Sequence, residues 1–169
     1  MKYRLQFFYF SWLFWFSNIF ILNDRRRAIF LGVTYPNLIV KRNVKLRRNI
    51  NFYGGHSCRG KVEIGENSFI NEECFIDHSS IVFIGSNVAI GMRCMILSSS
   101  HHIGNIVRCG KDKRMVTTIK DNCWLGAGVI VFPGVIIGQG CVISAGEKID
   151  RDIPDNILVK NGNLIPINI

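Results

Sequence analysis

The sequence predicts an all-β fold: a coil of short parallel strands joined by tight turns, preceded by an apolar helical segment and interrupted by one extended loop at about residues 102–118. The first observation is a large aliphatic residue at every sixth position within three blocks of the chain. These positions are Ile64, Ile70, Ile76, Ile84, Ile90, Ile96, Ile119, Leu125, Val131, Ile137, Ile143 and Ile149. An α-helix has 3.6 residues per turn and cannot keep such a spacing on one face, whereas a coil in which each six-residue unit forms one side and one corner can. Three units then complete one triangular turn.

Two further regularities fit the same coil. Glycine directly follows the aliphatic residue at Gly65, Gly85, Gly91, Gly126 and Gly138. A small or β-branched residue recurs four positions after it, at Ser68, Cys74, Val88, Cys94, Ser100, Cys123, Val129, Val135 and Cys141. We expect the aliphatic and small side chains to face the interior and the glycines to occupy the corners. Interior cysteines then act as small apolar side chains, and with no CxxC motif the chain reads as a reduced, cytoplasmic protein without a zinc site.

The repeats divide the chain into three parts. These are an aromatic and basic helical segment (residues 1–37), the coil (residues 38–160) and a C-terminal tail (residues 161–169). The repeat is broken between Ile50 and Ile64, by a two-residue slip between Ile76 and Ile84, and by the extended loop. Interruptions of a regular scaffold are the expected places for a functional site.

The first 48 residues carry the whole formal charge of +9, because they hold ten Lys or Arg and one acid, whereas the rest of the chain holds eleven of each. An apolar run from Leu5 to Leu22, rich in Phe, Tyr and Trp, is followed after two intervening residues by Arg25, Arg26 and Arg27. The run is near the lower length limit for a membrane-spanning helix, and its polar residues weaken that interpretation. No small-residue cleavage site follows the run, which argues against a signal peptide. A helix lying on a membrane surface fits the aromatic and basic composition, and a helix packed on the coil or in an oligomer contact is the alternative. Aromatics that stack on bases would be interleaved with the basic residues, so we expect no nucleic-acid partner.

The register of these repeats makes the chain resemble the left-handed β-helix acyltransferases of the hexapeptide-repeat family, over about residues 38–160. The resemblance implies the left hand of the coil, a homotrimer with sites between subunits, and acetyl-CoA as co-substrate. In its aromatic N-terminal segment the chain looks more like the capsule, O-antigen and colanic-acid O-acetyltransferases than like the galactoside enzymes. The resemblance therefore implies a saccharide acceptor.

The segment from Ile96 to His101 is similar to the one that holds the catalytic histidine in galactoside and maltose O-acetyltransferases, and Arg108 follows seven residues later, as an arginine does there. The resemblance implies that His101 is the general base and that Ser100 and Arg108 lie near the acceptor. An imidazole with an ordinary pKa of about 6.5 is suited to removing a hydroxyl proton at neutral pH. An ordinary polar loop histidine is the alternative, and His102 is the competing neighbour.

Two more positions carry over by register. Asn71 falls where the sugar acetyltransferases place an active-site asparagine, and Ser79 falls where the galactoside enzymes have an acidic acceptor-binding residue. The resemblance implies that both lie at the acceptor. Asparagine is also a common turn residue, which is the structural alternative for Asn71.

The stretch from Asn122 to Ala127 is similar to the repeat that binds coenzyme A in the family. Trp124 is expected to face outward, against the pantetheine arm or a neighbouring chain. Ala127 and Ala145 match positions whose backbone groups pair with the pantetheine amides. Asp150 and Arg151 match the pair near the adenosine phosphates, with Arg151 in place of a lysine; a guanidinium can bind phosphate through two parallel hydrogen bonds.

We therefore predict an acetyl-CoA-dependent O-acetyltransferase that transfers acetyl directly to a sugar hydroxyl of a bacterial surface polysaccharide or its lipid-linked precursor, at the inner face of the cytoplasmic membrane. A sugar or amino-acid acetyltransferase of small-molecule metabolism, such as a nucleotide-sugar N-acetyltransferase or a serine acetyltransferase, is the alternative, since one histidine serves oxygen and nitrogen acceptors alike. The γ-carbonic anhydrases share the coil but need three histidines converging on zinc, and the four histidines of this chain lack that spacing. A non-catalytic scaffold would need neither His101 nor Trp124.

Overall fold

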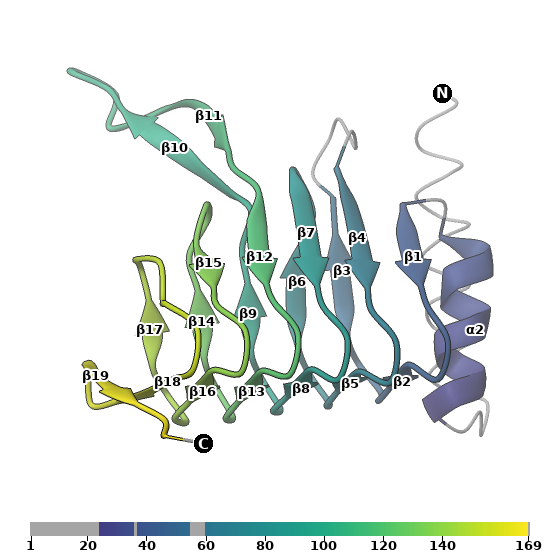
Figure 1. Ribbon diagram of the computed structural model, residues 1–169. Coiled ribbons are helices and arrows are strands. Elements are labelled where there is room, and N and C mark those ends of the chain that lie inside the picture. Colours follow the sequence, from purple (N-terminus) through teal and green to yellow (C-terminus); the bar gives the residue numbers. More distant parts are fainter. Residues whose placement is uncertain (1–23, 36, 55–59, 169) are drawn as a thin grey trace, which may run out of the picture.

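The structure is a computed structural model that describes residues 24–35, 37–54 and 60–168, and in it the chain forms a β-solenoid of three parallel sheets (Figure 1). Sheet A consists of β1 (Leu38–Val40), β4 (Lys61–Ile64), β7 (Ile81–Ile84), β12 (Thr117–Ile119) and β15 (Ile136–Ile137). Sheet B consists of β2 (Lys45–Leu46), β5 (Phe69–Ile70), β8 (Ala89–Ile90), β13 (Trp124–Leu125), β16 (Val142–Ile143), β18 (Ile157–Lys160) and β19 (Asn163–Pro166). Sheet C consists of β3 (Asn51–Tyr53), β6 (Phe75–Asp77), β9 (Met95–Ile96), β14 (Ile130–Val131) and β17 (Lys148–Ile149). Each coil passes through sheets A, B and C in turn and is joined by three corners, which we name A–B, B–C and C–A after the sheets they connect.

The interior of the coil is built from the aliphatic positions of the repeat. All of these side chains are at most 3% exposed, which confirms the prediction. Parallel pairing places equivalent residues of successive coils side by side, as Ile64, Ile84 and Ile119 are in sheet A. Burial of such a continuous apolar column is the main stabilising contribution in a solenoid, where each coil contacts only its neighbours.

The corner glycines are required because successive coils approach closely. A Cβ at Gly91 would lie 2.6 Å from the backbone of Gly126 and Ala127, and a Cβ at Gly65 would lie 2.4 Å from the carbonyl carbon of Gly85. The left-handed backbone falls instead two residues later; in the A–B corners it is taken by asparagines such as Asn67 (φ 60°), a residue that tolerates that conformation. The prediction of glycine at the corners is thus confirmed, with close packing as the reason.

The cysteines of the repeat line the corners from the inside. Their thiols donate to carbonyl oxygens of the following coil, as in Cys94 to Gly126 at 3.1 Å and Cys123 to Gly138 at 2.9 Å. Burial raises the pKa of the Cys123 thiol to about 11, so it stays protonated and unreactive at neutral pH. All cysteines within the described ranges are free thiols.

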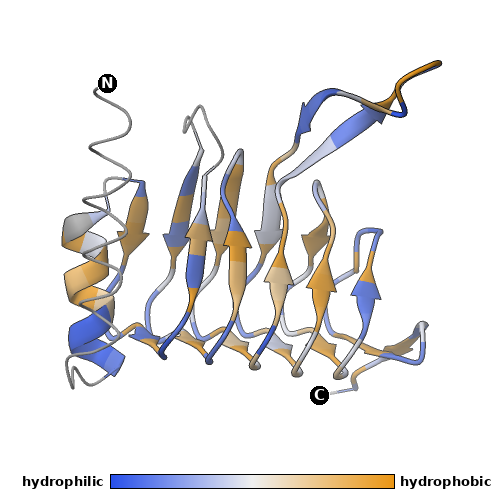
Figure 2. Cartoon of the chain, turned by 180° about the vertical axis from the view of Figure 1, so that it is seen from behind, coloured by the Kyte–Doolittle hydropathy of each residue, from blue (hydrophilic) through white to orange (hydrophobic). Residues whose placement is uncertain are grey.

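The loop expected at about residues 102–118 is an antiparallel β-hairpin that leaves the coil at a C–A corner (Figure 1). Its strands are β10 (Ser99–Ile103) and β11 (Cys109–Arg114), and β12 returns the chain to sheet A at Thr117. The placement of Ser100 as a small interior residue is wrong, because β10 has already left the coil there and Ser100 is exposed. The tip is apolar and open to solvent: Ile103, Ile106 and Val107 are 85%, 94% and 70% exposed (Figure 2).

The two ends of the coil differ. At the N-terminal end, α2 (Asp24–Thr34) packs Ala28 and Leu31 onto β1 and β2. At the C-terminal end, β18 and β19 form an antiparallel pair that includes most of the expected tail.

The apolar run from Leu5 to Leu22 lies outside the described residues. Within the part of the chain that the structure describes, no helix is long and apolar enough to cross a membrane. Arg27, expected as part of the basic flank of this run, is instead 2% exposed and donates to the carbonyl of Leu46 at 2.9 Å and to Asp24 at 3.2 Å. It anchors α2 to the coil and does not belong to the basic surface.

Candidate functional site

His101 projects from the hairpin, half-exposed, with one ring nitrogen bound to the backbone. Its Nδ1 lies 3.1 Å from the carbonyl oxygen of Gly110 on β11. A carbonyl oxygen can only accept, so the neutral ring carries its proton on Nδ1. Nε2 then carries the lone pair, as a general base requires.

Asp112 stands directly across from His101 in the hairpin. The two residues are register partners, and Asp112 Oδ1 lies 3.6 Å from His101 Nδ1. Asp112 also accepts from Arg114 at 3.5 Å. Its carboxylate therefore opposes an imidazolium once Nε2 has taken a proton, although both side chains are exposed and the attraction is screened by water.

The base of the hairpin is held by a buried carboxylate that the sequence interpretation missed. Asp77 is 4% exposed and accepts hydrogen bonds from Ser79, Ser98 and Ser99. Burial opposes ionisation of Asp77, but these hydroxyl and amide donors outweigh it and hold its pKa below the usual range. The signal in the sequence was an acidic residue placed directly in the two-residue slip after Ile76.

The returning arm of the hairpin is attached at the same place. Met115 donates its N–H to the carbonyl of Ser98 at 2.9 Å, and the hydroxyl of Thr117 donates to the carbonyl of Leu97 at 2.6 Å. Thr117 in turn accepts from the N–H of Gly134 at 3.1 Å. Both arms are thus fastened to the coil within a few residues of each other.

The three residues expected near the acceptor on this side occupy different positions. Ser79 is 7% exposed, and its hydroxyl donates to Asp77 at 2.6 Å, so it belongs to the base of the hairpin. Ser100 precedes His101 on β10, and strand alternation directs its side chain to the opposite face. Arg108 lies at the tip, where its guanidinium donates to the carbonyl of Gly104 at 3.2 Å.

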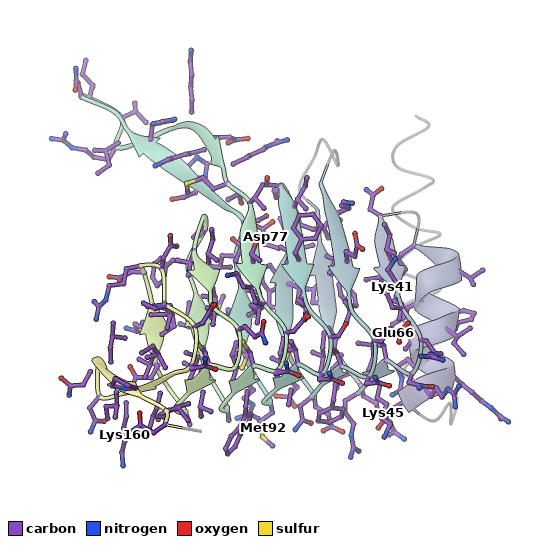
Figure 3. The ribbon with its side chains drawn as sticks, in the orientation of Figure 1. Lys41, Lys45, Glu66, Asp77, Met92 and Lys160 are labelled. Carbon is purple, nitrogen blue, oxygen red and sulfur yellow. The ribbon has the colours of Figure 1, made fainter. Side chains whose placement is uncertain are left out.

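Asn71 lies apart from His101, in a B–C corner directly after β5. Its side-chain oxygen accepts the N–H of Glu72 at 2.8 Å, which is a turn-stabilising bond. The corners of the following coils hold Met92, Ala127 and Ala145 beside it. Figure 3 shows Met92 at the edge of the coil opposite Asp77, so a single chain does not bring Asn71 and His101 together.

The B–C corner also carries the expected coenzyme A residues. Trp124 faces outward on β13 and is 59% exposed, while its neighbour Leu125 is buried. Ala127 and Ala145 follow in successive coils, and in the described part of the chain neither donates its N–H to another residue. These two amide donors, in exposed residues with small side chains near an exposed indole, are groups that an extended amide chain such as pantetheine could pair with.

Asp150 and Arg151 lie at the next corner along the chain, C–A, beyond β17. Arg151 donates to the carbonyl of Gly162 at 3.1 Å and stands 3.9 Å from Asp150. Both side chains are exposed. They therefore share an edge of the coil with the hairpin rather than with Ala127 and Ala145.

The two main surface hollows of the described residues do not unite these groups. Two surface hollows of the described residues, of about 630 and 520 Å³, lie over sheet A and beside α2, and neither is lined by a residue named above as a site candidate. Among residues 24–35, 37–54 and 60–168, no cluster of His, Cys, Asp and Glu is arranged to hold a metal ion. His78 is buried in the slip, and His56 lies outside these ranges.

The chain is similar to known proteins in its repeats, its sequence and its fold. Residues 116–151 match the family model described as the hexapeptide repeat of succinyl-transferase. Over 98 residues the chain is 35% identical to a galactoside O-acetyltransferase of Lactococcus lactis, a match that covers 57% of this chain and 47% of the relative. The chain spans about half the length of the curated relatives it matches.

Two solved structures share the fold over nearly the whole chain. A maltose O-acetyltransferase from Clostridium difficile is 28% identical with a TM-score of 0.79, and the match covers 95% of this chain and 86% of that one. A galactoside acetyltransferase in complex with coenzyme A is 26% identical with a TM-score of 0.80, and the match covers 94% and 78%. The family model, the relative and the two structures all agree with the repeats and the coil described above.

Proposed function

We propose that this chain is a member of the hexapeptide-repeat acyltransferase family and an acetyl-CoA-dependent O-acetyltransferase that acts on a sugar hydroxyl of a bacterial surface polysaccharide or its lipid-linked precursor. The observation that carries the proposal is the state of His101: its Nδ1 is bound to the Gly110 carbonyl, so Nε2 is the basic nitrogen, on an exposed hairpin. The sequence and structural similarity to sugar O-acetyltransferases supports the choice of a hydroxyl acceptor.

His101 acts as the general base. Acetyl-CoA supplies the acetyl group as an activated thioester. His101 Nε2 removes the proton from the acceptor hydroxyl as that oxygen attacks the thioester carbonyl, and the imidazolium then returns the proton to the departing thiolate. The carboxylate of Asp112 stands 3.6 Å from Nδ1 and faces the ring while the ring holds the transferred proton.

Transfer is direct, without an acyl-enzyme. A covalent route would need a thiol or hydroxyl activated by His101, and in the described part of the chain neither ring nitrogen contacts such a group. The backbone N–H of Ala127 is the donor we assign to the developing oxyanion, because it has no partner of its own and lies in the corner assigned to the thioester arm.

A homotrimer completes the site. His101 and Arg151 lie along the C–A edge, whereas Trp124, Ala127 and Ala145 lie along the B–C edge of the same coil. In a trimer, three subunits pack around a common axis, and the C–A edge of each subunit faces the B–C edge of the next. This arrangement brings the general base of one subunit to the coenzyme A surface of its neighbour. Asn71 then enters the site with Ala127 rather than with His101.

The aromatic N-terminal segment directs the enzyme to the inner face of the cytoplasmic membrane. Phe, Tyr and Trp favour the headgroup boundary, and basic residues attract anionic lipid at about 1 kcal/mol each near the surface. Part of the basic segment is not available for this, since Arg27 is buried and Arg47 pairs with Asp24 at 3.1 Å. Membrane association therefore depends mainly on the aromatic run.

One experiment tests the proposed activity. The purified protein is incubated with acetyl-CoA and a panel of saccharides and amino sugars, and release of the coenzyme A thiol is followed while the product is located by NMR. The expected product carries an O-acetyl ester on a sugar ring. An N-acetyl product only would support the amine alternative, and no thiol release with any acceptor class would favour a scaffold role.

A further inference from the structure

Asp77 is a buried carboxylate at the foot of the hairpin that carries His101, and the reaction described above does not use it. It ends β6, in the coil before the one that gives rise to the hairpin. Figure 3 shows Asp77 beside the point where the hairpin leaves the coil. A carboxylate that is 4% exposed needs several donors, because an unpaired buried charge costs much free energy.

Both oxygens of Asp77 are fully engaged. Oδ1 accepts the N–H and the hydroxyl of Ser79, at 2.9 and 2.6 Å, within its own corner. Oδ2 accepts the N–H of Ser98 at 3.2 Å and the hydroxyl of Ser99 at 2.6 Å, in the next coil. One side chain thus ties a corner of the regular coil to the first residues of the hairpin by charge-assisted hydrogen bonds, which are roughly twice as strong as neutral ones.

The hydrogen bond from Ser99 to Asp77 forms on the same face of β10 that presents His101. Ser99 and His101 are two positions apart, so their side chains project from one side of the strand, about 7 Å from each other. Ser99 is turned to the coil by its bond to Asp77, and this fixes the rotation of β10 about its axis. The direction of the His101 ring follows from that rotation.

Few other contacts fix this part of the hairpin. From Ser100 to the tip, β10 is exposed and pairs with β11 alone. Ser98 adds one further bond to the coil, in which its hydroxyl accepts the N–H of Ser80 at 2.9 Å. The orientation of a two-stranded ribbon is therefore decided at its base, because such a ribbon has little stability of its own.

We propose that Asp77 is a positioning residue for His101, which holds Ser99 and thereby sets the place and direction of the catalytic imidazole. The catalytic consequence rests on the proposed function, whereas the anchoring of the hairpin does not. A catalytic group displaced by about 1 Å loses on the order of 10² in rate. Loss of the tie therefore lowers kcat and leaves the acetyl-CoA surface at the B–C edge intact.

The test uses two matched pairs of variants in the intact chain. Ser99→Ala removes the hydroxyl that binds Asp77, whereas Ser99→Thr keeps it in a residue that suits a strand. Asp77→Asn removes the charge and an acceptor oxygen, and Asp121→Asn is its control, because Asp121 accepts a cross-coil N–H from Ser86 at 2.8 Å at an A–B corner. The measurements are kcat, KM for acetyl-CoA, and hydrogen exchange of peptides covering residues 99–114.

We expect Ser99→Ala and Asp77→Asn to lower kcat by about ten- to a hundredfold, to leave KM for acetyl-CoA within about twofold, and to speed exchange in the hairpin. Ser99→Thr and Asp121→Asn should retain kcat and slow hairpin exchange. Wild-type kcat or unchanged hairpin exchange in Ser99→Ala would overturn the proposal, even if Asp77→Asn fails to fold. If the intact protein shows no acetyl transfer at all, the proposed function fails, and the exchange rates still decide whether Asp77 anchors the hairpin.

Discussion

Substitution of Gly126 by alanine tests whether the B–C corner binds acetyl-CoA, and a control variant separates this effect from a loss of coil stability. A Cβ at Gly126 would lie 2.6 Å from the amide nitrogen and 2.9 Å from the Cα of Ala145, in the corner assigned to pantetheine. Ordinary van der Waals contact of a Cβ begins at about 3.4 Å, so Ala145 has to move outward by roughly 0.8 Å. The neighbouring atoms are backbone and cannot rotate away.

Two consequences follow from that shift. Overpacking of this kind costs roughly 1–3 kcal/mol, which for a chain of this length lowers Tm by about 2–12 °C. A hydrogen bond from a corner N–H to the pantetheine arm contributes about 0.5–1.5 kcal/mol, so its loss raises KM for acetyl-CoA roughly two- to twelvefold. The acceptor KM should stay the same.

Gly65→Ala is the matched control. A Cβ there would lie 2.4 Å from the carbonyl carbon of Gly85 and 2.5 Å from the nitrogen of Ser86, again in backbone, but at an A–B corner away from the assigned site. Both variants should lose a similar amount of thermal stability, measured by circular dichroism, and only Gly126→Ala should raise KM for acetyl-CoA in steady-state kinetics. Equal KM values for the two variants would refute the assignment of this corner to acetyl-CoA.

Three further predictions concern the phosphate end, the N-terminal segment and the pH dependence of stability. Arg151→Ala should weaken acetyl-CoA binding, measured by calorimetry, and leave the KM for the acceptor unchanged. Arg42→Ala, which removes an ion pair with Glu66 at an A–B corner, should change neither quantity. An unchanged affinity of Arg151→Ala for acetyl-CoA would show that Arg151 does not belong to the site. Deletion of residues 1–23, which keeps Asp24 and its ion pairs, should abolish sedimentation with anionic vesicles and retain activity on a soluble acceptor. If the truncated protein aggregates and the intact chain does not bind vesicles, the segment packs on the coil or in an oligomer contact instead. Burial lowers the pKa of His78, so below about pH 6.5 the unfolded chain binds a proton that the folded chain does not bind. The free energy of unfolding, measured in urea, should therefore fall as the pH drops from about 6.5 toward the lower pKa of the folded state. A free energy of unfolding that is constant between about pH 7 and 5 would contradict this.

The coil could be predicted from the sequence because its restraint is periodic. Every aliphatic position of the repeat is buried, and each glycine that directly follows one meets the backbone of the next coil. Such regularities appear in the sequence as spacing, and a spacing can be read without knowing which residues are neighbours in space. The hairpin broke this rule: Ser100 keeps the spacing of an interior residue but lies on a strand that has left the coil.

The candidate site was harder to predict from the sequence, because its contacts join residues of different coils and different edges. Asp77 and Ser99 are 22 positions apart and their bond leaves no periodic trace. Asn71 occupies a B–C corner and the hairpin of His101 leaves a C–A corner, and a spacing of six residues is the same at every corner. Arg27 was counted with the surface charges because a buried, paired arginine has the same letter as an exposed one.

The most direct measurement of the central claim compares His101→Ala with His102→Ala. Both residues are exposed on β10, and only His101 has its ring fixed by the Gly110 carbonyl. General-base catalysis typically contributes about 10²–10⁴ to the rate, so His101→Ala should lower kcat for acetyl transfer by that factor while calorimetry finds acetyl-CoA binding nearly unchanged. His102→Ala should keep most of the activity. If His101→Ala retains more than about a tenth of the wild-type kcat, His101 is not the general base.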